Sequence, residues 1–253
     1  MIGLFLSGTG NTKHCLELLL HILDDNAVSI PIENEQAAKL VSKHEIIFLA
    51  YPTQYSNIPY MVRDFIQRNS KIWAGKKVFC MTTMGLFSGD GTGCVARLLK
   101  KYGAKIIGGL QVKMPDSISD SKLLKHPKEK NLRTIKSADK KIIEAACQMK
   151  RGIFCQEGLG IFAHIAGLFG QRLWFYSKTK KYTKSLKISD ACIGCGLCSD
   201  ICPMNNIIIE NGTAKAQEKC TMCYRCINSC PKQAITLLGR KIVKQYQFEN
   251  YIS

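Results

Sequence analysis

The chain reads CIGCGLCSDICP at residues 192–203 and CTMCYRCINSCP at residues 220–231, and these two stretches decide how its last quarter folds. Both have the pattern C-x2-C-x2-C-x3-C-P, which is the bacterial spacing for iron–sulfur ligands. A cubane cluster needs four thiolates that converge from different directions. Gaps of two residues let one tight loop reach three corners of the cube, so the spacing predicts iron–sulfur clusters.

Two other uses of closely spaced cysteines are less favoured. A disulfide framework fits poorly, because the segment after Met1 does not resemble a secretion signal and the rest of the chain is long enough to build its own core. Zinc sites usually have C-x2-C pairs separated by a longer spacer, whereas each stretch here places four cysteines within eleven residues.

The region from Ile188 to Leu238 resembles the ferredoxins that carry two [4Fe–4S] clusters. Gly194 and Gly196 fit this resemblance, because glycine lets backbone amides approach the cluster sulfurs closely. In that family the fourth cysteine of each run binds the other cluster. The resemblance therefore implies one cluster on Cys192, Cys195, Cys198 and Cys230, and a second on Cys202, Cys220, Cys223 and Cys226.

A length of 253 residues suits two domains, so a larger domain is expected before the cysteines. Apolar, β-branched or aromatic runs predict strands at Ile2–Leu6, Ala27–Ile30, Glu45–Ala50, Lys77–Thr82 and Lys105–Val112. Helical patterns alternate with them at Thr12–Leu23, Glu35–Ser42, Pro59–Asn69, Thr92–Tyr102 and Asn131–Lys150. This alternation predicts an α/β domain with a doubly wound, five-stranded parallel sheet over residues 1–150. A connecting arm over residues 151–187 and a small α+β cluster domain with a C-terminal tail over 188–253 would follow.

The first predicted strand ends in Ser7-Gly8-Thr9-Gly10-Asn11-Thr12, and a helix begins there. Glycines, three hydroxyls and free amides at a helix N-terminus together make a cradle for an anion. The loop has neither the lysine of a P-loop nor a G-x-G-x-x-G run, so a nucleoside triphosphate and a dinucleotide are less favoured. The alternative is an ordinary capped turn, with Asn11 or Thr12 as the N-cap.

This loop resembles the phosphate loop of flavodoxins, which bind FMN and carry a T/S-x-T-G-N-T run directly after their first strand. The similarity in element order covers residues 1–150 and implies the flavodoxin-like form of the sheet. The residues that the resemblance assigns to the FMN phosphate are Ser7, Thr9, Gly10, Asn11 and Thr12.

Two further loops, after the third and fourth predicted strands, are expected at the same edge of the sheet. In flavodoxins these loops embrace the isoalloxazine ring. The residues assigned to the flavin in this way are Tyr51, Pro52, Thr53, Tyr55, Asn57, Thr83, Met84, Gly85 and Phe87. Tyr51, Tyr55 and Phe87 are candidates for ring contact, and the alternative for each is a loop anchor packed on the core. We expect Asp90 to cap the following helix.

An apolar stretch at residues 158–170 is followed by a basic and aromatic one up to Lys184. The apolar part falls short of the roughly twenty residues needed to span a bilayer. We favour an arm that packs across the two domains, and a helix in a membrane interface is the alternative. His164 is expected to be a packed or solvent-facing helix residue.

The formal net charge is +17, and the basic excess is densest at residues 151–189, which hold 7 Lys/Arg against 1 Asp/Glu. This pattern indicates an acidic partner or an anionic surface. Nucleic acid is not expected, because no binding motif accompanies the charge. Thirteen cysteines indicate a reducing compartment, and we expect a cytoplasmic protein of an anaerobe. The oligomeric state stays open.

The chain as a whole resembles the flavodoxin–ferredoxin fusion proteins called ferrodoxins, which are common among anaerobes. The resemblance implies an electron-transfer protein with two [4Fe–4S] clusters and FMN, which couples one- and two-electron chemistry and exchanges electrons with redox partner proteins. No catalytic residue is predicted. An FMN-dependent oxidoreductase fed by the clusters, and a redox conduit or sensor at a membrane surface, are the alternatives.

Overall fold

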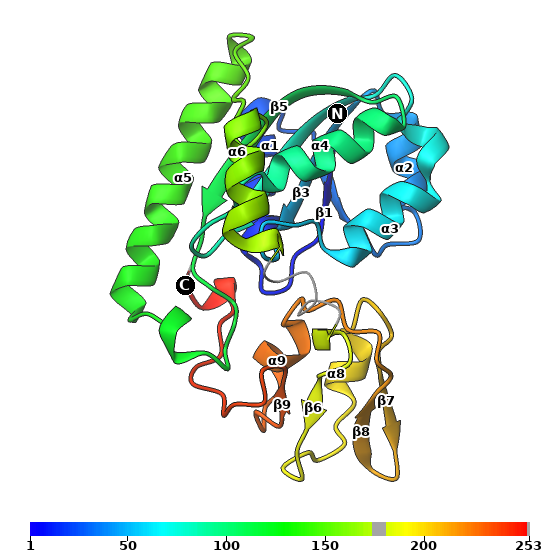
Figure 1. Ribbon diagram of the computed structural model, residues 1–253, viewed down its shortest axis with the longest axis vertical. Coiled ribbons are helices and arrows are strands. Elements are labelled where there is room, and N and C mark those ends of the chain that lie inside the picture. Colours follow the sequence, from blue (N-terminus) through cyan, green and yellow to red (C-terminus); the bar gives the residue numbers. More distant parts are fainter. Residues whose placement is uncertain (174–180, 252–253) are drawn as a thin grey trace. The chain divides into compact units, whose positions relative to one another are not determined.

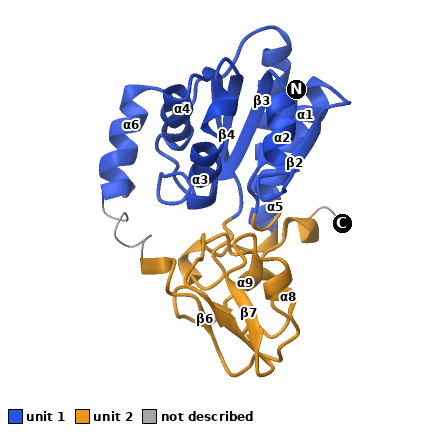
Figure 2. Ribbon diagram, turned by 90° about the vertical axis from the view of Figure 1, so that its right-hand side faces the viewer, with its two compact units in different colours: residues 1–7, 11–115, 129–174 blue, residues 8–10, 116–128, 175–253 orange. Residues whose placement is uncertain are grey.

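The computed structural model describes residues 1–173 and 181–251 of the chain (Figure 1). Two compact units are present (Figure 2). The first unit contains residues 1–7, 11–115 and 129–174, and the second contains residues 8–10, 116–128 and 175–253. Within the described residues, every helix is too short or too polar to cross a membrane.

The first unit is built on a five-stranded sheet with the strand order β2-β1-β3-β4-β5. Its strands are β1 (Ile2–Phe5), β2 (Val28–Pro31), β3 (Ile46–Pro52), β4 (Lys77–Met84) and β5 (Lys105–Lys113). All neighbouring strands run parallel. β3 and β4 are buried along almost their whole length, as expected for strands covered on both faces. This strand order is that of the flavodoxin-like doubly wound fold, so the predicted class of this unit is confirmed.

Helices cover both faces of the sheet (Figure 1). They are α1 (Asn11–Leu23), α2 (Ala37–Lys43), α3 (Tyr60–Arg68), the 3-10 turn η1 (Ser70–Trp73), α4 (Gly91–Lys101) and α5 (Lys128–Lys150). Apolar side chains of α2, α3 and α4 share one core with β1, β3 and β4. α1 packs closely on the opposite face, where a Cβ on Gly3 would lie 2.5 Å from the end of the Leu20 side chain. His14 of α1 is hydrogen-bonded to Asp139 of α5 at 2.7 Å.

The chain beyond α5 stays with the first unit up to residue 174. The amide of Gly109 in β5 donates to the carbonyl of Cys155 at 2.7 Å, and the amide of Glu157 donates back to Gly109 at 2.9 Å. This short run therefore extends the edge of the sheet. Helix α6 (Ile161–Gly167) follows, and the π-helical segment η3 (Leu168–Arg172) continues it without a break.

The second unit contains two small antiparallel ribbons. β6 (Lys187–Ile188) pairs with β9 (Ile235–Thr236), and β7 (Ile207–Glu210) pairs with β8 (Thr213–Ala216). Short helices α8 (Leu197–Asp200) and α9 (Arg225–Ser229) and the 3-10 turns η2 (Lys122–Leu124) and η4 (Phe248–Tyr251) complete it. A shift of 28 positions, which carries Cys192 onto Cys220, also carries β6 onto the end of β8 and the start of β7 onto β9. The unit thus contains an internal repeat, which fits the small α+β ferredoxin-like domain expected from the sequence.

A segment from the middle of the chain, residues 116–128, completes the second unit. Its Asp120 is fully buried and accepts three hydrogen bonds. The Tyr224 hydroxyl donates to one carboxylate oxygen at 3.0 Å, and the amides of Leu237 and Leu238 donate to the other at 2.9 and 2.7 Å. The Ser119 carbonyl also accepts a bond from the amide of Val243 at 2.8 Å.

Candidate functional site

Two cavities of the second unit are each lined by four cysteines. Cys192, Cys195, Cys198 and Cys230 line one of them. Cys202, Cys220, Cys223 and Cys226 line the other. Each cavity thus takes three cysteines from one run and the fourth from the other run. These are the two sets that the ferredoxin resemblance implies.

Left-handed backbone turns the two cysteine runs around their cavities. In the first run, Gly194 and Gly196 have φ angles of 64° and 81°. At the equivalent positions of the second run, Met222 and Tyr224 have φ angles of 55° and 61°. This conformation costs a residue with a side chain roughly 1–2 kcal/mol. The second run therefore tolerates strain at its candidate ligands, as is common at functional sites.

These turns bring backbone amides onto the cysteine sulfurs. Gly194 donates to Cys192 at 3.5 Å, and Met222 donates to Cys220 at 3.3 Å. The fourth cysteine of each run also accepts an amide bond, from Asn206 to Cys202 at 3.3 Å and from Ala234 to Cys230 at 3.4 Å. Hydrogen bonds to sulfur disperse negative charge and are one of the means by which a protein sets the potential of an iron–sulfur cluster.

Several of these thiols resist ionisation. Burial raises the pKa of Cys220 to about 12, the amide of Met222 opposes this effect, and the nearby Cys223 and Cys202 add to it. Burial, reinforced by the other sulfurs around its cavity, also raises the pKa of Cys226. Such thiols become thiolates readily only beside compensating positive charge, which iron supplies.

The arrangement of the sulfurs fits a cluster better than a single ion. Among the described residues, no three His, Cys, Asp or Glu side chains gather closely enough to hold one metal ion. The four sulfurs of each set instead surround a cavity. A cubane with iron at its corners needs ligands spaced in this way.

The candidate phosphate loop begins where β1 ends. Helix α1 starts at Asn11, so its first free amides belong to the loop. The side chains of Ser7, Thr9, Asn11 and Thr12 are all buried. Within the first unit, the Asn11 amide donates to the carbonyl of Pro115 at 2.8 Å. Thr9 and Gly10 lie in the short stretch that groups with the second unit, and Gly10 has a φ of 91° that favours glycine.

Thr83 joins the three loops that the sequence singled out. Its hydroxyl is 2.8 Å from the hydroxyl of Thr12 in the candidate phosphate loop. Its carbonyl accepts bonds from the amide of Thr53 at 2.9 Å and from the Thr53 hydroxyl at 3.2 Å. Thr83 is 4% exposed, so these bonds are shielded from water. The loops after β1, β3 and β4 are therefore held together at one edge of the sheet.

The three aromatic candidates lie in different surroundings. Tyr51 is fully buried, and its hydroxyl donates to the carbonyl of Gly91, so it anchors its loop to α4. Phe87 is 43% exposed. Tyr55 has a φ of 51° and Ser56 one of 56°, and the backbones of Gln54 and Asn57 bond to each other across them. Two central residues with positive φ define a type I′ turn, which presents Tyr55 at its tip.

The remaining ring-loop candidates occupy the same two loops. Pro52, Met84 and Gly85 are partly buried. The side-chain oxygen of Asn57 accepts bonds from the amide of Ile58 at 2.9 Å and from Arg63 at 3.2 Å, so Asn57 stiffens the base of its turn.

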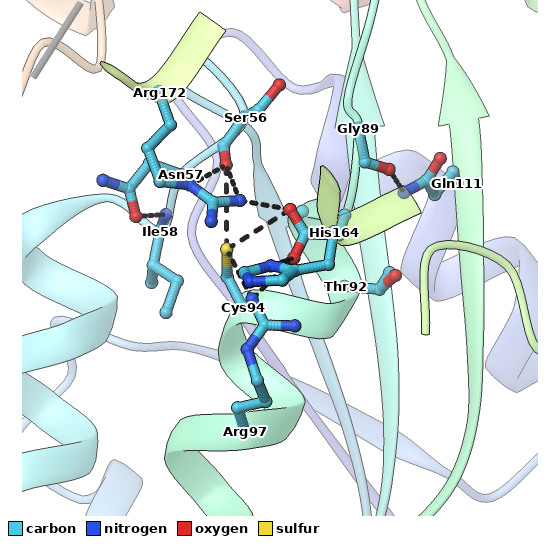
Figure 3. Close-up of polar contacts among 12 residues, drawn as sticks. Ser56, Asn57, Ile58, Gly89, Thr92, Cys94, Arg97, Gln111, His164 and Arg172 are labelled. Carbon is cyan, nitrogen blue, oxygen red and sulfur yellow. Dashed lines mark hydrogen bonds and ion pairs between the residues drawn. The ribbon is translucent and has the colours of Figure 1, made fainter. Parts of the chain in front are cut away.

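Asp90 stands at the start of α4, and the expectation that it caps this helix is wrong. Its side chain makes no cap hydrogen bond, although it is fully buried. The carboxylate instead binds Arg97 at 2.5 Å, the Nδ1 of His164 at 2.8 Å, and Arg172 (Figure 3). The carboxylate of Asp90 therefore bonds to basic side chains and does not cap α4.

Burial disfavours the charged form of Asp90, but hydrogen bonds from Arg97 and His164 and the charge of Arg172 outweigh it, so its pKa lies below the ordinary value. Arg172 also donates to the carbonyl of Ser56 from Nε at 3.1 Å and from Nη2 at 2.9 Å (Figure 3). It thereby joins the loop after β3 to the loop after β4. The sequence shows only an isolated acid before a helix at this position. Two of the three partners of Asp90 lie 74 and 82 residues away in the chain, so local sequence does not reveal them.

The cysteine region is similar to known iron–sulfur proteins. Residues 184–231 match the family model of the 4Fe-4S dicluster domain. An uncharacterized ferredoxin of Methanocaldococcus jannaschii is 42% identical over 60 residues, which are 22% of this chain and 74% of that protein. One component of the Na(+)-translocating ferredoxin:NAD(+) oxidoreductase complex of Acetobacterium woodii is 41% identical over 63 residues. The match covers 23% of this chain and 19% of the length of that component.

Solved structures similar to the chain include several flavodoxins. The two-electron reduced flavodoxin of Megasphaera elsdenii is 22% identical, with a TM-score of 0.43, and the overlap covers 58% of this chain and 99% of that one. A Fusobacterium nucleatum flavodoxin bound to flavin mononucleotide is 17% identical, with a TM-score of 0.42, over 60% of this chain and 98% of that one. The flavodoxin-like fold itself rests on the strand order described above. The chain therefore belongs to the 4Fe-4S ferredoxins, and its dicluster domain follows a domain of flavodoxin-like fold.

Proposed function

We propose that the chain is an electron-transfer protein that holds two [4Fe–4S] clusters and one FMN. The observation that carries this proposal is the pair of cavities, each lined by three cysteines of one run and one cysteine of the other. Two separate four-thiolate sets are what two cubanes require. The flavodoxin-like sheet, with a glycine- and hydroxyl-rich loop at the start of α1, supports FMN as the third group.

When bound, each cluster exchanges one electron and the flavin exchanges one or two, so two one-electron steps balance one two-electron step. The residues of the chain hold these groups and adjust their surroundings. The cysteine sulfurs bind iron, and the amides of Gly194, Met222, Asn206 and Ala234 bond to those sulfurs. The loop from Ser7 to Thr12 would hold the phosphate of FMN, and the loops that carry Tyr55 and Phe87 would flank its ring.

Redox proteins are the proposed partners on both sides of this exchange. The relative in Acetobacterium woodii is, by its name, part of a ferredoxin:NAD(+) oxidoreductase complex, which supports partners of this class. The formal net charge of +17 favours an acidic docking surface on such a partner.

Cofactor content tests the proposal directly. Protein purified without oxygen should contain about eight irons and about one FMN per chain. Full iron with no affinity for FMN would reject the flavin part of the proposal. Full FMN with about four irons would reject the second cluster.

Cysteine alkylation tests which sulfurs share a cluster. Cys202→Ala should leave Cys220 and Cys223 open to alkylation, while Cys192 and Cys195 stay protected. Cys198→Ala should produce the reverse pattern. Cys147 is exposed and outside both runs, so Cys147→Ala is the control and should retain all iron. If Cys202→Ala exposed Cys192 and Cys195 instead, each run would hold its own cluster and the assignment would be wrong.

The flavin site is tested in the candidate phosphate loop. Thr9→Ala and Asn11→Ala should each weaken FMN binding by about tenfold, which corresponds to the loss of a hydrogen bond to a charged group. Iron content should not change. Asn26 is exposed and lies outside the loop, so Asn26→Ala serves as the matched control. Equal FMN affinity in the wild type and all three variants would show that this loop does not hold the phosphate.

A further inference from the structure

Two sets of contacts connect the segment after α5 to the loops that would flank the flavin ring. The first set starts at Glu157, whose carboxylate accepts the amide of Gln111 at 2.8 Å and whose carbonyl accepts the hydroxyl of Thr92 at 2.6 Å. The side-chain amide of Gln111 in turn donates to the carbonyl of Gly89 at 2.7 Å (Figure 3). Glu157 therefore helps to hold the end of the loop after β4 and the first turn of α4.

The second set of contacts comes from the helix formed by α6 and η3. His164 and Arg172 both bind Asp90, the buried acid at the end of the same loop. The packing is also close, because a Cβ on Gly167 would lie 2.5 Å from a carboxylate oxygen of Asp90. A Cβ on Gly89 would lie 2.5 Å from the Cα of Gly167. Charge pairing and close packing thus hold this helix against the loop after β4.

The π-helical turn lets both polar side chains reach one carboxylate. His164 and Arg172 are eight positions apart, so a regular α-helix would separate them by about 80° around its axis. In η3 the amide of Leu173 bonds to the carbonyl of Leu168, five residues earlier. This wider turn rotates less per residue and brings Arg172 toward the side of the helix that carries His164.

Arg172 also holds the turn at Tyr55 and Ser56 in the loop after β3. Both turn residues have a left-handed backbone, which is unfavourable for a residue with a side chain. The guanidinium of Arg172 donates twice to the carbonyl of Ser56, at 3.1 and 2.9 Å (Figure 3). The side chain of Arg172 is 14% exposed, so water competes little for these bonds. One residue of the helix thus holds both a strained turn in one loop and the acid of the other loop.

We propose that the helix of α6 and η3 is part of the flavin site, and that Arg172 positions the two loops around the flavin ring. This inference rests on the proposed binding of FMN. Loops that are fixed before the ring arrives need no ordering when it binds, so the affinity for FMN is higher. Without Arg172, the turn at Tyr55 and Ser56 loses two of the bonds that hold it. The flavin site then extends beyond the flavodoxin-like residues 1–150.

An FMN titration of the full chain, loaded with iron and freed of flavin, tests the role of Arg172. Arg172→Gln should weaken FMN binding at least about tenfold, because the turn and the buried acid lose a charged donor. Arg97 also binds Asp90, and it bonds to Cys94 within α4. Arg97→Gln is therefore the matched control, and it should keep the FMN affinity within about twofold of the wild type.

A pair of glycine variants tests the packing of the helix without removing a charge. Gly167→Ala must push the helix away from Asp90, because the added Cβ would lie 2.5 Å from the carboxylate. Gly170→Ala, further along the same helix, would place its Cβ 3.6 Å from Phe87, which is an ordinary contact. Alanine is the better helix former at both positions. Gly167→Ala should weaken FMN binding at least about fivefold, and Gly170→Ala should bind FMN as the wild type does.

Two further measurements separate positioning of the loops from a general loss of stability. At saturating FMN, the visible circular dichroism of the bound flavin reports the surroundings of its ring. This signal should change in Arg172→Gln and stay the same in Arg97→Gln. In the flavin-free chain, hydrogen exchange at residues 54–57 and 86–90 should become faster in Arg172→Gln, while β3 and β4 stay protected. Slow exchange in these strands shows that the variant is folded.

The outcomes distinguish this inference from the proposed function. If the wild type bound no FMN, both would be wrong. If Thr9→Ala weakened FMN binding but Arg172→Gln kept the wild-type affinity and dichroism, the phosphate loop would stand and this inference would be overturned. An equal loss of affinity in Arg97→Gln and Arg172→Gln would also overturn it, because the effect would then come from the ion pairs of Asp90 alone.

Discussion

Asp90 and Met222 show, at the scale of single residues, what the two candidate sites require. Asp90 is fully buried, and the ion pairs with Arg97 and Arg172 offset the cost of burying its charge. Met222 has a φ of 55°, which places its amide on the sulfur of Cys220. In both cases contacts with neighbouring residues accompany an unfavourable state, which is a buried charge at Asp90 and a left-handed backbone at Met222.

Replacement of Asp90 should destabilise the first unit. Asp90→Asn leaves Arg172, whose side chain is 14% exposed, beside a neutral amide, whereas Arg97 at 45% can turn toward water. The expected loss is about 2 kcal/mol, which is below the usual cost of breaking a fully buried pair because the cations are partly solvated. Thermal unfolding followed by circular dichroism should show a Tm lower by about 4–8 °C. A smaller shift for Arg97→Gln is the control.

The difference in stability between the wild type and Asp90→Asn should depend on pH. The folded pKa of Asp90 lies below its ordinary value, so its ionised form stabilises the fold. This stabilisation is complete above the unfolded pKa of about 4 and is lost as the pH falls through the lower folded value. The Tm difference between wild type and Asp90→Asn should therefore be largest near neutral pH and should shrink as the pH falls below about 4. A difference that grows in acid would contradict the assigned ion pairs.

Thr12 and Thr83 provide a test of the link between the loops. Thr12→Val removes one hydroxyl of a buried pair and leaves the other hydroxyl without it, which costs about 1–2 kcal/mol. The double variant Thr12→Val/Thr83→Val should recover part of this loss, because neither polar group then remains. Urea unfolding of the two single variants and the double variant measures the coupling. Strict additivity would show that the two hydroxyls do not interact.

At the scale of elements, the local sequence does not indicate where the segment after β5 packs. β5 ends the sheet of the first unit, but residues 116–128 belong to the second unit. Asp120 there bonds to Tyr224 at the start of α9 and to the two amides that follow β9. It thus fixes both ends of a run that carries two of the candidate cluster ligands, Cys226 and Cys230.

Asp120→Ala should loosen the cluster region and leave the flavin site unchanged. It removes three hydrogen bonds from a fully buried position, so the expected loss is about 3 kcal/mol. Iron release to a chelator should become at least about tenfold faster, while the FMN content stays the same. Asp190 is an exposed acid of the same unit, and Asp190→Ala should release iron at the wild-type rate. Equal rates for both variants would show that Asp120 has no structural role.

At the scale of the whole molecule, the two units gain their stability from different sources. The first unit has a core that extends across five strands and three helices. The second unit has ribbons of two to four residues per strand and a small core that includes several of the cysteines. A unit with so little apolar core generally needs metal to stay folded.

Removal of iron should therefore unfold one unit and spare the other. After oxidative loss of the clusters in the presence of a chelator, hydrogen exchange should become fast across residues 188–238. Exchange in β3 and β4 should stay slow, because the core of the sheet does not depend on metal. Continued protection of residues 188–238 without iron would show that the second unit folds by its apolar core alone.

The sequence by itself predicted the strands and helices of the first unit and, through the ferredoxin resemblance, two sets of four cysteines, because both follow from local patterns. The five strands of the first unit begin and end within two residues of their predicted limits, since burial follows the pattern of apolar residues. The cysteine spacing and the ferredoxin resemblance together anticipated which four sulfurs line each cavity. Only the tertiary structure decided the surroundings of Asp90, the anchoring role of Tyr51 and the place of Asp120. Their partners are distant in the chain, and charge pairing in a buried site depends on packing that no local pattern encodes.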